Sequence, residues 1–159
     1  MARTATRLIV LIALALAGCA EAPRFDQVVA QLPLQGATAR LFVYRDYDLT
    51  QSLSWVPIKA NGNQLGGLGP GHVLVCDLAP GTYTIEAQSQ GLWPEQNKTV
   101  TVAAGQQVYA RIGSFHTTDP DSHGQVLMTT FVVMLQDSAA GRRDIAQLWY
   151  TPCEHPLVG

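Results

Sequence analysis

The chain has 159 residues, of which 47% are apolar and 14% are charged, and its formal net charge is −2 at pH 7. This composition is typical of a globular domain with a substantial core and excludes a highly charged, disordered chain. The sequence has no run of lysine or arginine that would gather phosphates, so we expect no nucleic-acid partner.

The first eighteen residues have the order of a bacterial export signal. Two arginines precede an unbroken apolar run from Leu8 to Ala17, which is about half the length that a membrane-spanning helix needs. The run closes in Leu-Ala-Gly-Cys at positions 16–19, which resembles a lipobox, the motif in which the cysteine sulfur is acylated and the signal is cut before it. We therefore expect residues 1–18 to be a lipoprotein signal peptide and Cys19 to be lipidated. The alternative is an ordinary signal followed by an unrelated cysteine.

The residues after the signal indicate an address and a domain boundary. An aspartate directly after the lipidated cysteine would indicate retention in the inner membrane, but here Ala20 follows Cys19. We therefore expect an outer-membrane protein that faces the periplasm and contacts the membrane through its lipid. Residues 19–37 contain two prolines and several polar residues and are predicted to be the lipidated N-terminus and a flexible tether. Residues 38–159 are enough for one domain.

Two cysteines remain once Cys19 is lipidated. Cys76 and Cys153 form a single available pair in an oxidising periplasm. A bond between them would tie the C-terminal tail to the predicted sheet and close a long loop, which the chain-entropy model credits with about 4–5 kcal/mol. The alternative is two buried free thiols, because the sequence does not give the separation of the two Cα atoms.

Short extended segments follow one another at intervals of about ten residues. Residues 39–45 carry apolar side chains on both faces, as in a strand buried between neighbours. Asn61 and Gly62 mark a hairpin, because both tolerate a positive φ. Strict alternation over residues 82–87 indicates a half-buried strand. The strands expected in chain order are 39–45, 55–60, 63–65, 72–78, 82–87, 98–103, 107–115 and 126–135.

These seven or eight strands, separated by Gly/Pro turns, predict a mostly β protein folded as an antiparallel β-sandwich. One short C-terminal helix is expected over residues 144–150. Ile145, Leu148 and Trp149 would share one stripe of that helix, and Pro152 would end it.

Four blocks of sequence carry a resemblance to a known family. They are Ala39–Arg45, Asn61–Gly66, Leu78–Ile85 and Ala104–Arg111. In this order they resemble an uncharacterised family of bacterial lipoproteins, a domain of unknown function with a prealbumin-like or Ig-like sandwich related to PEGA modules. The resemblance extends from Thr38 to about Ser114 and implies a fold and an envelope address. It implies no catalytic residues, because each block is a predicted turn or strand.

One predicted loop gathers several residues that bind metals. His116, Asp119, Asp121 and His123 lie within eight residues, and imidazole and carboxylate are ligand types that zinc accepts. The competing interpretation is a solvated turn, because Asp, Pro, Ser and Gly favour turns without any ligand.

Signs of catalysis are missing from the sequence. It contains no Gly-x-Ser-x-Gly, no His-Glu-x-x-His and no phosphate-binding loop, so we expect neither an enzyme nor a bound cofactor. Trp93, next to a proline in a predicted loop, is a candidate contact for a partner, or else folds back over the sandwich edge. The sequence thus predicts a non-catalytic binding or scaffolding module that holds an envelope protein through loops or a free sheet edge. The alternative is a periplasmic protein that binds metal through the loop from His116 to His123.

Overall fold

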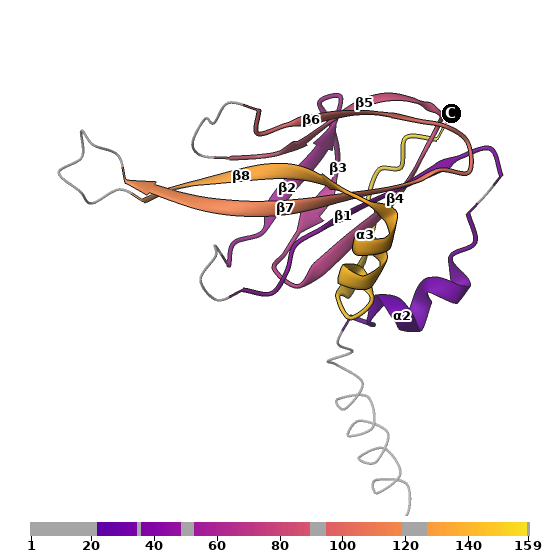
Figure 1. Cartoon of the computed structure of the whole chain (residues 1–159), viewed down its shortest axis with the longest axis horizontal. Coiled ribbons are helices and arrows are strands. Elements are labelled where there is room, and N and C mark those ends of the chain that lie inside the picture. The colour runs from indigo at the N-terminus through magenta and orange to yellow at the C-terminus, as the bar shows by residue number, and fades with distance from the viewer. Residues whose placement is uncertain (1–21, 35, 49–52, 90–94, 119–126, 159) are drawn as a thin grey trace, which may run out of the picture.

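The computed structural model describes residues 22–34, 36–48, 53–89, 95–118 and 127–158. This part of the chain is mostly β, with two sheets and short helices (Figure 1). The helical elements are α2 (Phe25–Val28), the 3-10 turn η1 (Val29–Gln31) and α3 (Ser138–Ile145). The strands are β1 (Ala39–Tyr44), β2 (Val56–Ala60), β3 (Asn63–Leu68), β4 (His72–Leu78), β5 (Gly81–Ala87), β6 (Lys98–Val102), β7 (Gln107–Thr118), β8 (Leu127–Gln136) and β9 (Trp149–Pro152).

The strands form a five-stranded sheet in the order β8-β7-β1-β4-β9 and a four-stranded sheet in the order β3-β2-β5-β6. Most neighbours are antiparallel, but β1 pairs with β7, and β4 with β9, in parallel. The expectation of a wholly antiparallel arrangement is therefore wrong for these two pairs. Each parallel pair is joined by a long crossover that passes through the other sheet, β2 to β6 between β1 and β7 and β5 to α3 between β4 and β9, and such crossovers permit parallel pairing.

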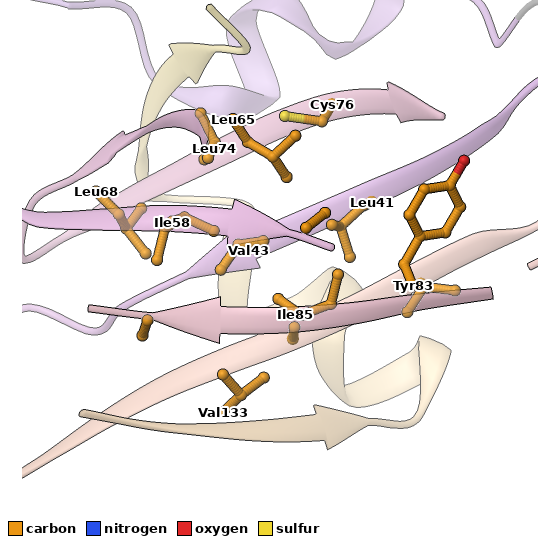
Figure 2. Packing of buried hydrophobic residues seen from close by; sticks show 14 of the residues in the cluster. Leu41, Val43, Ile58, Leu65, Leu68, Leu74, Cys76, Tyr83, Ile85 and Val133 are labelled. Carbon is orange, nitrogen blue, oxygen red and sulfur yellow. The ribbon is translucent and has the colours of Figure 1, made fainter. Parts of the chain in front are cut away.

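β1 lies in the middle of the larger sheet and is buried along its whole length, as the apolar pattern of residues 39–45 predicts. Leu41 and Val43 belong to the core shared by both sheets (Figure 2). Phe42 and Tyr44 point to the opposite face, where they pack with Phe25 and Ile145 from the helices. Two apolar layers thus meet at one strand, because successive side chains of a strand point to opposite faces.

The predicted hairpin between β2 and β3 is present. Asn61 and Gly62 connect the strands with φ values of 50° and 77°. The Asn61 side chain also accepts a hydrogen bond from the backbone N–H of Thr84 at 2.8 Å, which fixes the turn against β5.

The C-terminal helix differs from its prediction. The helix occupies Ser138–Ile145 rather than 144–150, and Trp149–Pro152 forms the ninth strand. Asp137 starts the helix by accepting hydrogen bonds from the backbone N–H groups of Ala139 and Ala140. Beyond Ile145 the backbone finds partners in the sheet instead, since Trp149 N–H donates to the carbonyl of Gly71 at 2.9 Å.

The segment predicted as a flexible tether is partly folded. Phe25 is buried and meets the Phe42 ring edge-on at 5.6 Å. Its N–H donates to the carbonyl of Leu148, and Tyr150 N–H donates to the carbonyl of Pro23. The packed structure therefore begins well before residue 38, because one aromatic side chain in this segment completes the layer outside β1.

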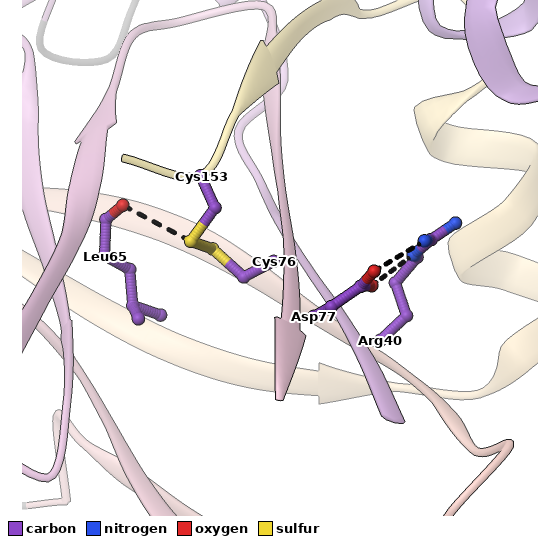
Figure 3. The surroundings of a disulfide bond; sticks show 5 residues. All are labelled: Arg40, Leu65, Cys76, Asp77 and Cys153. Atoms are coloured by element: carbon purple, nitrogen blue, oxygen red, sulfur yellow. Dashed lines mark hydrogen bonds and ion pairs between the residues drawn. A yellow bond between two sulfur atoms is a disulfide. The ribbon is translucent and has the colours of Figure 1, made fainter. Parts of the chain in front are cut away.

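A disulfide joins Cys76 of β4 to Cys153, which directly follows β9 (Figure 3). The Cα atoms are 4.9 Å apart and the cysteines are 77 residues apart in sequence. Next to the bond, Glu154 N–H donates to the carbonyl of Leu65 in β3. The tail thus connects one edge of the larger sheet to the edge of the smaller sheet.

The opposite edge of the larger sheet is partly covered. Phe131 N–H of β8 donates to Ser89 Oγ, and Val133 N–H donates to the carbonyl of Gln96, both at 2.8 Å. These contacts satisfy backbone donors of β8 that would otherwise be available for pairing with another strand.

Candidate functional site

Most site residues predicted from the sequence lie outside the described residues: Cys19, Trp93, Asp119, Asp121 and His123. His116 is described, on β7, where it is exposed and its Nδ1 lies 3.2 Å from Thr129 Oγ1. Within the described ranges no three histidine, cysteine or acidic side chains are grouped so that they would hold a metal ion. The described residues therefore add no support to the metal-binding alternative.

None of the helices among the described residues has the length and apolar character needed to span a bilayer.

A pocket of about 470 Å³ lies between α2, α3 and the outer face of β1 and β7. Its apolar lining comes from all of these elements and from η1: Phe25, Val29, Leu32, Phe42, Tyr109 and Ile145. Asp26, Arg40, Gln107 and Arg142 add polar groups. A cavity of this size with a mainly apolar wall and a few polar groups is typical of ligand-binding sites.

Stacked aromatic rings form the floor of this pocket. Phe42 lies 4.7 Å from Tyr109 with nearly parallel rings. The Tyr109 hydroxyl donates to Gln107 Oε1 at 3.0 Å and accepts from Arg142 Nε at 3.3 Å. The floor is thus fixed by packing and by hydrogen bonds. The neighbouring strands β1 and β7 supply its two rings, because alternate residues of a strand point to the same face.

Arg40 occupies one end of the pocket, and most of its N–H groups already have partners. Its guanidinium pairs with Asp77 (Figure 3) and donates to the backbone carbonyls of Leu32 and Pro33. Sequence reasoning did not single out Arg40, although an arginine inside the apolar run 39–45 was a usable signal. The arrangement gives Arg40 a structural role and leaves Arg142 as the more available cation.

Tyr44 connects β1 to α3 beneath the same helices. Its hydroxyl donates to Asp144 Oδ2 at 2.7 Å. Burial, and secondly the hydrogen bond to Asp144, raise the pKa of Tyr44 far above its usual value near 10. The phenol therefore stays protonated and acts as a hydrogen-bond donor rather than as a base.

A second hollow, of about 440 Å³, lies where β4 and β9 begin. Arg24, Tyr47, His72 and Trp149 line it, and the Trp55 ring lies 4.9 Å from the His72 ring. Burial lowers the pKa of His72, whose Nδ1 is 3.0 Å from Thr151 Oγ1. Sequence reasoning missed this group because its members come from four separate segments.

Comparison of the chain with protein-family models, curated proteins and solved structures gave no match in any of the three searches. Its function has to be inferred from the residues and their geometry.

Proposed function

We propose that this protein is a lipid-anchored lipoprotein of the cell envelope that serves as a non-catalytic binding or scaffolding module and needs no cofactor. In this proposal Cys19 carries the lipid, the protein faces the periplasm from the outer membrane, and the two sheets form a prealbumin-like sandwich of the lipoprotein family that the sequence resembles. The disulfide between Cys76 and Cys153 supports export, because such bonds persist in oxidising compartments.

The pocket beneath α2 and α3 is the observation that carries the binding proposal. Its apolar wall and stacked floor suit an apolar side chain or short apolar segment of an envelope protein. Arg142 lines the pocket and donates to Tyr109 through Nε, so its Nη groups offer a cation to a carboxylate of the partner.

Strand addition is hindered at two of the four sheet edges. Two N–H donors of β8 are occupied by Ser89 and Gln96, and the tail after Cys153 bonds to Leu65 of β3. Main-chain pairing needs a row of open donors and acceptors, so we place the binding site in the pocket rather than at these two edges.

The proposal is tested by in-cell cross-linking followed by mass spectrometry of tagged proteins. Val29 lines the pocket and is 44% exposed, whereas Val158 is 48% exposed and is not among the residues that line the pocket. Val29→Arg should fill the pocket entrance without disturbing the core, and Val158→Arg is its matched control. Cys19→Ala removes the proposed anchor.

We expect the wild type and Val158→Arg to capture the same envelope protein, and Val29→Arg and Cys19→Ala to lose most of it. If Val29→Arg captures as much as the wild type, the pocket is not the binding site. If no envelope protein is enriched over bystanders in the wild type, the module proposal fails.

A further inference from the structure

Exposed apolar side chains gather in the segment between β1 and β2. Of the seven large hydrophobic residues exposed in the described part of the chain, Tyr47, Leu53 and Trp55 belong to this segment. Tyr47 is 67% and Trp55 is 58% exposed. Together with Arg24, His72 and Trp149 of the second hollow, Tyr47 and Trp55 form what we call the aromatic patch.

The patch is held in place by the turn between β3 and β4. The Trp55 ring lies so close to Gly69 that a Cβ atom on that glycine would be 2.8 Å from it. A Cβ atom on Gly71 would be 3.2 Å from the Tyr47 Cβ atom and 3.5 Å from the Tyr47 ring. Gly71 also has a φ of 74°, which favours glycine. The two exposed rings therefore pack against Gly69 and Gly71, and the fold fixes their exposed positions.

Arg24 connects the patch to the start of the packed chain. Its guanidinium carbon lies 3.0 Å from the centre of the Trp149 ring, and the two residues form a backbone bridge. Arg24 is only five residues after Cys19. An extended chain spans at most about 3.6 Å per residue, so the Cα atoms of Cys19 and Arg24 are at most about 18 Å apart.

Because Cys19 and Arg24 are close together, the aromatic patch is nearer to the proposed lipid than the other end of β4 is. β4 begins at His72 in the patch and ends at Leu78, six residues later, which is a distance of about 20 Å along a strand. Leu157 bridges to Leu78 at that far end. A lipid on Cys19 would therefore keep the aromatic patch close to the bilayer and the residues around Leu157 away from it.

We propose that the aromatic patch is a membrane-contact surface on which the anchored protein rests against phospholipid headgroups. The inference rests on the proposed lipid anchor at Cys19. Tryptophan and tyrosine are enriched at the membrane–water interface, because their rings are apolar with a polar edge. Arg24 donates to the carbonyl of Gln147 through Nη1, and its other N–H groups would serve lipid phosphates. Of the two carboxylates that flank Tyr47, Asp46 and Asp48, Asp46 is held in an ion pair by Arg111.

The test uses lipidated, full-length protein in vesicles of phosphatidylethanolamine and phosphatidylglycerol, with and without lipids brominated near the headgroup. Trp93→Phe leaves Trp55 and Trp149 as the fluorescent reporters. The matched control replaces all three tryptophans by phenylalanine and adds Val158→Trp at the far end. Mass spectrometry of the same samples measures the lipid on Cys19.

We expect brominated lipid to lower the emission of Trp55 and Trp149 by about twofold or more, because interfacial tryptophans lie within reach of the bromine atoms. Emission from the tryptophan introduced at position 158 should be unchanged. If the lipid is present but brominated lipid lowers the emission of Trp55 and Trp149 no more than that of the tryptophan at position 158, the patch is not the membrane-contact surface, and the inference is overturned while the anchor stands. If Cys19 carries no lipid, the proposed anchor fails and the inference fails with it.

Discussion

Arg40 and Asp77 face each other directly across the β1–β4 pair and form a two-point ion pair (Figure 3). Nε lies 2.6 Å from Oδ1 and Nη2 lies 2.9 Å from Oδ2. The same guanidinium donates to the carbonyls of Leu32 and Pro33. One buried cation thus fixes the chain between η1 and β1 to the outer face of the larger sheet.

Replacing Asp77 should therefore destabilise the fold. Asp77→Leu leaves the Arg40 guanidinium, whose side chain is 8% exposed, without its carboxylate, and breaking such a pair from one side costs about 3 kcal/mol. The free energy of unfolding from urea titration measures the loss. Adding Arg40→Met should recover part of it, because the uncompensated charge is then gone. A single variant as stable as the wild type would contradict this role.

The disulfide should contribute strongly to stability. For a closed loop of 77 residues, the chain-entropy model predicts a loss of about 4–5 kcal/mol when Cys76 and Cys153 are both replaced by alanine. Guanidinium chloride unfolding measures it, and reduction of the unmutated pair should give a similar loss. In the Cys19→Ala form, thiol titration of the denatured protein should find two thiols only after reduction. Two thiols before reduction would show that the bond does not form.

Gly141 should resist substitution although it lies inside a helix. A Cβ atom at this position would overlap the Tyr109 side chain. Overpacking of this kind costs about 1–3 kcal/mol, which offsets the gain of about 1 kcal/mol expected for glycine to alanine in a helix. We expect thermal unfolding of Gly141→Ala at a lower temperature than the wild type.

Gly36→Ala is the control for that experiment, because no atom lies within 4 Å of a Cβ built there. Its free energy of unfolding should stay within about 0.5 kcal/mol of the wild type. An unchanged or higher unfolding temperature for Gly141→Ala would mean that α3 shifts away from Tyr109 at no cost.

His72 should make stability depend on pH. Burial lowers its pKa in the folded protein, while the unfolded chain keeps a value of about 6.5. Below that value the unfolded state binds the proton first, so stability is complete above it and falls as the pH is lowered towards the folded pKa. His72→Gln should remove this part of the loss between about pH 7 and pH 5.

His155 is the matched control, because it is an exposed histidine. Unfolding temperatures of the wild type, His72→Gln and His155→Gln across this range separate the contribution of His72 from that of the carboxylates. Parallel curves for the wild type and His72→Gln would contradict the prediction.

Local patterns were enough to predict the β-rich class and much of its detail. The apolar run at 39–45, with apolar side chains on both faces, predicts the central strand β1. Asn61-Gly62 predicts the hairpin between β2 and β3 from backbone preference alone. Cys76 and Cys153 were identified as the available pair, while the alternative of free thiols needed a distance that only the folded chain supplies.

Tertiary pairing decided what local patterns could not. The spacing of Ile145, Leu148 and Trp149 predicts a helix. Trp149 instead pairs with β4, because the edge of the sheet offers hydrogen-bond partners to the backbone of this segment. Residues 19–37 read as a tether, yet Phe25 packs on Phe42. The pocket and the aromatic patch also combine segments that are distant in sequence. Sequence periodicity shows which face of a helix or strand is apolar. Which other segment packs against that face depends on contacts between residues far apart in the sequence, and therefore on the whole fold.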